Sequence, residues 1–133
     1  MSSRRFIIKG EGLPQWDAPI NHAVVVNNIC YVSGQLSVDN SGKYILGTIL
    51  EAAECAFGNF FAAITAAGFT LQEVVFVDLA FIDLQDVSIV NQLFFSYFAS
   101  ERKPARTIYQ AAALPFGGKI KVTGVAVKDS SST

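Results

Sequence analysis

The sequence contains few of the residues that build metal sites, disulfide frameworks or nucleic-acid surfaces. Its 133 residues include two cysteines and one histidine, and there is no CxxC motif. We therefore expect no metal site, no disulfide scaffold and no organic cofactor, and a reducing cytoplasm is the simplest location. Only 16% of the residues are charged and the net charge is −1, whereas a nucleic-acid-binding surface usually carries a basic stripe. No nucleic-acid partner is expected.

Long hydrophobic runs are also lacking. No stretch approaches the roughly 18–20 consecutive apolar residues that span a bilayer, so we expect no membrane association. The first residues, MSSRRFIIKGEG, have neither the apolar core nor the cleavage site of a secretory signal. Even so, 51% of the residues are hydrophobic, among them eleven phenylalanines. An apolar excess of this kind indicates that part of it is covered in a subunit interface, and we expect a homo-oligomer.

The length predicts one domain, residues 1–133, with a disordered tail at about 129–133. Two helices are indicated within it. Thr48 and Glu51 match a capping box, apolar residues follow at helical spacing, and Gly68 stands where a helix ends in a left-handed residue. The second helix is expected to begin at about Asp86 and to carry its apolar residues on one stripe.

Strand patterns surround these helices. Residues 23–26 and 29–34 are β-branched runs on either side of Asn-Asn, which predicts a β-hairpin. Residues 74–83 form an apolar run that scarcely alternates, as in a buried strand, and 106–111 and 119–127 complete the set. The order β-β-β-α-β-α-β-β predicts an α+β two-layer sandwich with a mixed six-stranded sheet and both helices on one face. The uncovered face would need a partner.

Arg106 stands out because it lies at the mouth of a nearly uncharged strand. From the residue alone, two interpretations are open. It forms an ion pair with Asp78, Glu73 or Glu101 or lies at the surface, or its guanidinium holds both oxygens of a ligand carboxylate. Ser33 and Gly34, at the end of a strand, are equally open: they mark a strand end and turn, or they offer a hydroxyl donor and close backbone approach to a ligand.

Four blocks carry a family resemblance. AVVVNNICYVSGQLSVDNSG, AAITAAGFTLQEVVFVDLAFIDLQDVSIVNQLFFSYF, PARTIYQAAALP and KIKVTGVAV occur in this order from about Pro19 to Val127. Together they resemble the RidA family, also called YjgF or L-PSP endoribonuclease-like. The resemblance implies a chorismate-mutase-like fold and a homotrimer whose small-molecule clefts lie between subunits. It also implies hydrolysis of reactive enamines and imines, such as 2-aminoacrylate, to 2-keto acids and ammonia.

Carried over by position, the resemblance assigns four binding residues. The family's carboxylate-binding arginine falls on Arg106, its serine and glycine fall on Ser33 and Gly34, and the asparagine of its V-N block falls on Asn91. Read alone, Asn91 is an amide in or near a helix. Under the resemblance, the partner of Arg106 is a small anionic carboxylate ligand.

Four positions depart from the pattern. Ile20 replaces a tyrosine of archetypal deaminases, Ile108 replaces a frequent cysteine, and His22 replaces a glutamine. Lys121 stands where the resemblance implies the glutamate that positions the attacking water. A protonated lysine cannot be a base, and its side chain either points to solvent or faces the cleft. If it faces the cleft beside Arg106, a doubly anionic ligand is favoured.

The first functional hypothesis is therefore an enamine or imine deaminase. Its catalytic residues would be Arg106 and Lys121, and its substrate-binding residues would be Arg106, Ser33, Gly34, Asn91, Ile20 and Ile108. Two alternatives stay open: a non-catalytic binding protein for an anionic metabolite, and a pathway-specific relative acting on another imine or a dicarboxylate. Ribonuclease activity is the least favoured, because the chain has one histidine and no basic, aromatic surface pattern.

Overall fold

The computed structural model describes residues 4–16, 18–99 and 101–129. The elements follow one another as β1 Arg4–Ile7, β2 Ala23–Val26, β3 Ile29–Gln35, α1 Ile49–Ala66, β4 Val74–Phe81, α2 Val87–Tyr97, β5 Ala105–Gln110 and β6 Ile120–Val127. The predicted order is confirmed, and β1 supplies the first strand, to which the sequence assigned no bounds. The predicted disordered tail lies outside the described residues except for Asp129.

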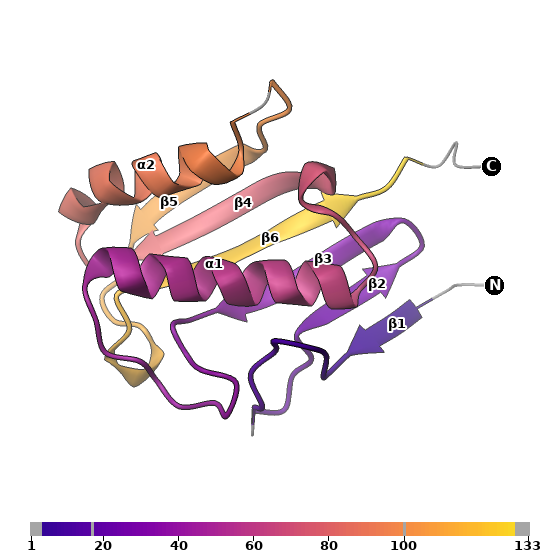
Figure 1. The fold of residues 1–133 in the computed structure, drawn as a ribbon, viewed down its shortest axis with the longest axis horizontal. Coiled ribbons are helices and arrows are strands. Elements are labelled where there is room, and N and C mark those ends of the chain that lie inside the picture. Colours follow the sequence, from indigo (N-terminus) through magenta and orange to yellow (C-terminus); the bar gives the residue numbers. More distant parts are fainter. Residues whose placement is uncertain (1–3, 17, 100, 130–133) are drawn as a thin grey trace.

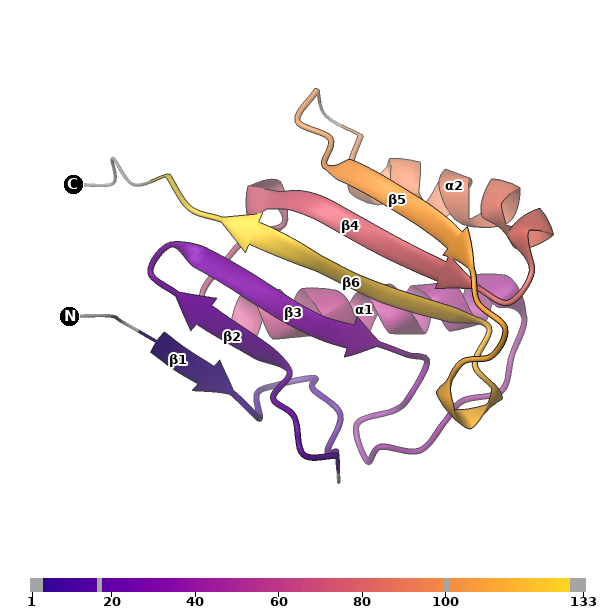
Figure 2. The same ribbon diagram turned by 180° about the vertical axis from the view of Figure 1, so that it is seen from behind.

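All six strands form one sheet in the order β1-β2-β3-β6-β4-β5 (Figures 1 and 2). Neighbouring strands are antiparallel except β4 and β5, which are parallel, so the predicted mixed sheet is confirmed. A parallel pair needs a crossover connection, and α2 provides it. The last strand in the chain, β6, lies in the middle of the sheet and therefore carries its residues into the centre of the molecule.

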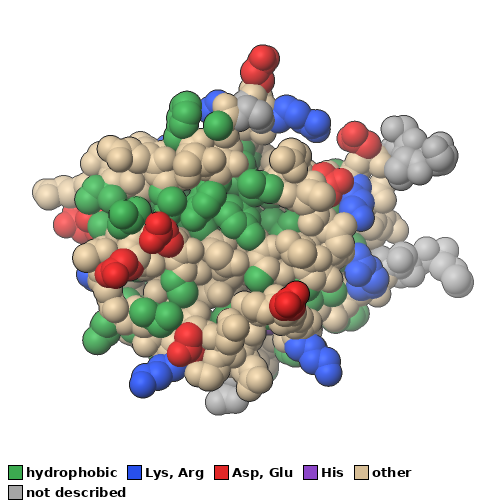
Figure 3. All heavy atoms as spheres, viewed as in Figure 1, with side chains coloured by type: hydrophobic (Ala, Val, Ile, Leu, Met, Phe, Trp, Pro, Cys, Tyr) green, Lys and Arg blue, Asp and Glu red, His purple; other side chains and the backbone are tan. Residues whose placement is uncertain are grey.

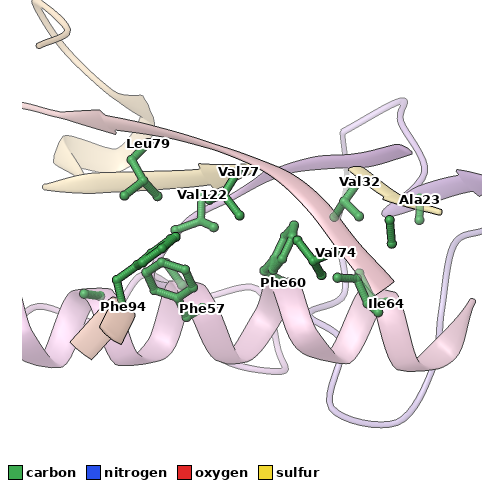
Figure 4. Close-up of a cluster of buried hydrophobic side chains, with 14 of the residues drawn as sticks. Ala23, Val32, Phe57, Phe60, Ile64, Val74, Val77, Leu79, Phe94 and Val122 are labelled. Atoms are coloured by element: carbon green, nitrogen blue, oxygen red, sulfur yellow. The ribbon is translucent and has the colours of Figure 1, made fainter. Parts of the chain in front are cut away.

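Both helices cover the same face of the sheet, as predicted (Figure 1). Phe57, Phe60 and Ile64 of α1 point from the helix towards Val77 and Val122 of the sheet (Figure 4), and all five side chains are almost fully buried. Along β6 the even-numbered residues are buried and the odd-numbered ones are half-buried. Lys121 therefore lies on the face opposite the helices, which no helix or strand among the described residues covers (Figure 2).

Local signals explain the ends of α1. The Thr48 side chain accepts a hydrogen bond from the Glu51 backbone N–H, and the Glu51 carboxylate accepts one from the Thr48 N–H, so the capping box is confirmed. The same Thr48 contacts lower the pKa of Glu51. Gly68 follows the helix at φ +88°, as predicted. By length and composition alone α1 could cross a membrane; its buried side, with Phe57 and Phe60, instead forms the centre of the core.

The hairpin prediction is confirmed, with Asn27 at φ 54° in the turn between β2 and β3. The strand predicted for residues 74–83 ends at Phe81, two residues early. The reason is local: the Asp83 carboxylate accepts a hydrogen bond from the Gln85 N–H and starts a 3-10 turn, Leu84–Asp86, that leads into α2. On the helix-covered side, hydrophobic side chains gather where α1 and α2 meet, and Lys and Arg lie at the margins (Figure 3).

Candidate active site

A cavity of about 520 Å³ lies beside the ends of β3 and β6. Its lining comes from the segment before β2, the end of β3 with the turn that follows it, and the loop that leads into β6. The residues are Gln15, Trp16, Ala18, Ile20, Gly34, Leu36, Val38, Ser41, Gly42, Pro115, Phe116 and Lys121. Most of these side chains are apolar, and Lys121 is the one charged side chain among the described lining residues. The cavity therefore suits a small molecule with an apolar part and a group that a cation can meet.

Lys121 is fixed in this cavity by its neighbours. A methyl group added at Gly34 would lie 2.8 Å from Cδ of Lys121, so the lysine stem passes directly over the bare glycine. Its Nζ donates a hydrogen bond to the Tyr109 hydroxyl at 3.2 Å. The neighbouring Lys119 turns elsewhere and donates to the Gly47 carbonyl at 2.6 Å. Of the two placements open for Lys121, the structure therefore has the one inside the cavity.

Trp16, which forms one wall of the cavity, packs against His22, and His22 is hydrogen-bonded to Gln35; both polar residues are buried. His22 Nε2 lies 2.7 Å from the Pro14 carbonyl oxygen, and because a carbonyl only accepts, Nε2 carries the proton. Nδ1 then accepts from the Gln35 amide at 3.3 Å. The centres of the His22 and Trp16 rings are 4.0 Å apart. Burial lowers the pKa of His22. His22 is therefore a hydrogen-bonded structural residue that supports the cavity wall.

Arg106 lies elsewhere. Its Nη1 donates to the Asn91 side-chain oxygen at 2.8 Å, and its guanidinium carbon is 4.8 Å from the centre of the Phe94 ring. Both partners belong to α2, so the arginine points to the helix-covered face, at the sheet edge formed by β5. Ile108, two residues along the strand, packs against the core on the same face. We call Asn91, Arg106 and Ile108 the arginine group.

The ion pairs considered for Arg106 are not found within the part of the chain that the structure describes. The Asp78 carboxylate accepts a hydrogen bond from the Thr107 hydroxyl, and the Glu73 carboxylate accepts one from the Thr70 N–H. One amide oxygen and one aromatic face thus hold the guanidinium. An exposed arginine oriented by such neutral groups keeps donors available for an anion.

Strand register separates Arg106 from Lys121. Lys121 and Tyr109 both lie opposite Ala80, in β6 and β5 respectively, so they share one face of the sheet. Arg106 is three residues before Tyr109 in the same strand, and successive side chains alternate between faces. Arg106 therefore lies on the other face. Ile20, Gly34 and Lys121, which we call the cavity group, and the arginine group do not meet within one chain.

Ser33 belongs to neither group. Its hydroxyl donates to the Asn21 carbonyl oxygen at 2.5 Å, and its N–H donates to the His22 carbonyl at 2.8 Å. In this structure a backbone carbonyl accepts from that hydroxyl, and its donation to a ligand stays a prediction. Ser33 instead ties β3 to the segment that carries Ile20 into the cavity.

Sequence reasoning missed the aromatic walls, Trp16 and Phe116. Phe116 adopts φ 61° in the loop Pro115–Gly117, and 67% of its side chain is exposed. A positive φ in a bulky residue is strained and often marks a functional position. The signal available in the sequence was the Pro-Phe-Gly-Gly turn just beyond the P-A-R block. Trp16, the only tryptophan, lies just before the segment that contains Ile20.

Nothing in the described residues assembles a metal site: no group of three or more His, Cys, Asp or Glu comes together there. Both cysteines are free. Burial raises the pKa of the Cys30 thiol to about 11, which keeps it protonated and unreactive.

Fold and cavity together define the class of protein: an α+β domain of the chorismate-mutase-like type with a small-molecule cavity at one end of its sheet. Residues 13–128 match the family model described as Endoribonuclease L-PSP. The chain is 37% identical to a 2-iminobutanoate/2-iminopropanoate deaminase of Capra hircus over 130 residues, which cover 97% of this chain and 94% of the relative. The chain belongs to the RidA/YjgF family, and the resemblance is confirmed.

Solved structures agree. The YEO7 protein of yeast superimposes with a TM-score of 0.88 at 30% identity, over 96% of this chain and 100% of that one. RidA from an Antarctic Psychrobacter gives a TM-score of 0.86 at 33% identity, over 93% of this chain and 100% of that one. The predicted fold class is therefore confirmed along nearly the whole chain.

Proposed function

We propose that this protein is an enamine or imine deaminase that releases a 2-keto acid and ammonia. The observation that carries the proposal is Arg106, an exposed guanidinium held by the Asn91 amide and the Phe94 ring, with no carboxylate partner among the described residues. The name of the Capra hircus relative, 2-iminobutanoate/2-iminopropanoate deaminase, supports the proposal that this chain catalyses imine hydrolysis. The substrates that this name implies carry a carboxylate beside the imine carbon, which a guanidinium fork fits.

We infer that the working site is shared between copies of the chain, in a homotrimer. The cavity group and the arginine group lie on opposite faces of one sheet, so a single chain cannot place both around one small substrate. A second copy docked against the uncovered face would bring its own Arg106 to the cavity. The exposed Tyr31 and Tyr109 on that face supply apolar surface for such a contact.

In this arrangement each residue has a defined task. Arg106 of one copy binds the substrate carboxylate. Gly34 of another, which has no side chain, leaves room for the Lys121 stem beside the cavity. The walls formed by Trp16, Ile20 and Phe116 receive the substrate side chain and exclude bulk water. In the net reaction the C=N carbon gains an oxygen from water as the keto oxygen and loses its nitrogen as ammonia.

A second candidate function is a non-catalytic binding protein for an anionic metabolite. One observation favours it: the described cavity lining has no carboxylate to activate water, and Lys121 stands where the family resemblance implies that carboxylate. If the bound molecule is a dicarboxylate, Lys121 would meet its second charge. The rest of the cavity lining is apolar, which favours a ligand with an apolar side chain over a dicarboxylate.

For the compartment, we keep the cytoplasm as the proposal, since both thiols are free. Family membership does not decide it, because the Reactive Intermediate Deaminase A of Arabidopsis thaliana, 29% identical, is described as chloroplastic.

The test of the reaction generates 2-aminoacrylate with a serine or threonine dehydratase and follows keto-acid release with and without the protein. We expect faster release with the wild type, loss of the acceleration in Arg106→Ala, and no change in Arg4→Ala, an exposed arginine at the far edge of the sheet that serves as the matched control. Ligand binding without acceleration would establish the binding protein instead.

The shared site has a separate test. Arg106→Ala and a cavity-blocking Gly34→Val variant should each be inactive alone. When the two are unfolded together and refolded, mixed trimers contain sites with an intact Arg106 from one chain and an intact cavity from another, and activity should return. No recovery in mixtures that demonstrably exchange subunits would show that the two groups do not serve one site.

A further inference from the structure

We propose that Lys121 is a covalent catalyst, whose amine forms a Schiff base with the substrate carbon before water enters. The proposal rests on the deaminase function above and specifies how that reaction proceeds in this chain. It concerns the position at which the resemblance implies a water-activating glutamate, a role that a lysine ammonium cannot fill.

The first argument is the placement of the amine. The Lys121 stem lies over Gly34, with Cδ 2.8 Å, Cγ 3.1 Å and Cε 3.6 Å from the point where a side chain at Gly34 would begin. The stem itself fills the space over Gly34, and Lys121 lines the cavity, so its amine is available to a substrate bound there. A nucleophile on a stem confined in this way is pre-positioned for attack, because little rotational freedom remains to be lost.

The second argument is what surrounds the amine. Surface lysines usually pair with carboxylates or extend to water. Lys119 donates to a backbone carbonyl, and Lys128 lies over the Phe69 ring at 4.8 Å. Lys121 donates to the Tyr109 hydroxyl at 3.2 Å instead of to a backbone carbonyl, and its ammonium lies over the same ring, 5.9 Å from the centre. No carboxylate forms an ion pair with it within the described residues.

The third argument is that this partner suits proton transfer. A phenol oxygen accepts from the amine and its O–H donates, so Tyr109 can accept a proton from Nζ as it passes its own hydroxyl proton to the substrate nitrogen. A carbonyl oxygen, the partner of Lys119, can only accept. Of Lys119 and Lys121, only Lys121 therefore donates to a group that can relay a proton.

The reaction balances without any added reagent. The neutral Lys121 amine attacks the C=N carbon of the protonated imine, forming a C–N bond while the π pair moves to the substrate nitrogen. A proton passes from Nζ to that nitrogen, by way of Tyr109, and ammonia leaves with the pair of the old C–N bond. Water then adds to the Lys121 Schiff base, Nζ is protonated, and the bond to Nζ breaks, giving the keto acid and the free amine. The sum is protonated imine plus water to keto acid plus ammonium, because the proton released as the keto acid forms is taken up by the ammonia.

The experiment traps the Schiff base from the product side. Wild-type protein is incubated with pyruvate and sodium cyanoborohydride, which reduces an imine to a stable amine, and intact-mass and peptide analysis locate the adduct. We expect one carboxyethyl group per chain on Lys121. The same treatment is applied to Lys121→Arg, which keeps the charge and cannot form the adduct, and to the matched control Lys119→Arg. Tyr109→Phe is tested alongside them.

The same variants are assayed for keto-acid release from 2-aminoacrylate. Lys121→Arg should lose roughly a hundredfold or more in rate, the scale on which groups that handle protons at the reacting centre contribute, whereas Lys119→Arg should match the wild type. Tyr109→Phe should slow release and still form the adduct on prolonged incubation with pyruvate. That separation would distinguish a proton relay from a residue that only supports the fold.

Three results would overturn the proposal in distinguishable ways. Acceleration that persists in Lys121→Arg, with no adduct in the wild type, rejects covalent catalysis and leaves the deaminase function standing. An adduct on Lys121 in a protein that never accelerates release rejects its role in turnover. Neither acceleration nor adduct rejects the proposed function together with this inference.

Discussion

Replacing Gly34 by alanine should destabilise the protein through Lys121 alone. The new Cβ would lie 2.8 Å from Cδ of Lys121, whereas ordinary contacts begin at 3.4 Å, so the lysine stem must move by about 0.6 Å. Forcing a methyl into a filled space costs about 1–3 kcal/mol, and an off-rotamer side chain about 0.5–1.5 kcal/mol. Because the stem is only half-buried and can shift outwards, we expect about 1–2 kcal/mol, a fall of about 4–7 °C in Tm for a chain of this length.

The cause can be isolated with a double-mutant cycle. In a Lys121→Ala background the obstructing stem is gone, and the Gly34→Ala change should then be neutral or slightly stabilising, because alanine narrows the unfolded ensemble. The coupling between the two positions should therefore be about 1–2 kcal/mol, measured as free energies of unfolding in urea at one fixed subunit concentration.

Gly124→Ala is the matched control. A Cβ there would lie 2.3 Å from the Phe76 carbonyl oxygen and 3.0 Å from the Phe60 ring, so this clash is with backbone and core. Removing the Lys121 stem should not relieve it. Additivity of Gly34→Ala and Lys121→Ala to within about 0.5 kcal/mol would refute the packing of the lysine stem over the glycine, and with it the argument for a confined amine.

Two further predictions concern the cavity wall and α1. Burial lowers the pKa of His22 below its usual 6.5. As the pH falls, the imidazole of the unfolded chain is therefore protonated before that of the folded protein. The stability that the neutral histidine contributes is complete above pH 6.5 and declines as the pH falls towards the lowered pKa. The unfolding free energy measured from pH 7.5 to 5.5 should therefore fall in the wild type and stay flatter in His22→Gln, and equal slopes would contradict this. Thr48→Ala removes the capping box and should cost about 1 kcal/mol in urea titrations, whereas Thr65→Ala, exposed in the same helix, should cost less.

The elements predicted well are those that neighbouring residues determine. The hairpin turn at Asn27, the capping box at Thr48 and the glycine after α1 each depend on residues within four positions of one another. The first strand could not be located in this way. Arg4–Ile7 pairs with β2, some twenty residues away, and three of its four residues are exposed, so neither alternation nor a neighbouring turn marks it.

The cavity shows the same limit. Gly34, Ile20 and Lys121 were singled out because they fall on family positions, and all three line the cavity. Trp16 and Phe116 lie in loops and were missed, because their place depends on distant contacts. Trp16 is held by the ring of His22, which in turn bonds to Gln35 on β3. No spacing in the sequence encodes that chain of contacts.

Strand alternation alone was enough to separate Arg106 from Lys121. Once Tyr109 and Lys121 are aligned opposite Ala80, the odd spacing between Arg106 and Tyr109 sends the arginine to the other face, whatever rotamers the side chains adopt. A site that needs both cations cannot then belong to one chain, and it must vanish when the chains separate. The two residues should therefore respond differently to dissociation. Under the proposed shared site, trapping of a keto acid on Lys121 would need the cavity alone, while tight binding of its carboxylate would also need Arg106 from a neighbour, so dilution should weaken binding before it abolishes the adduct.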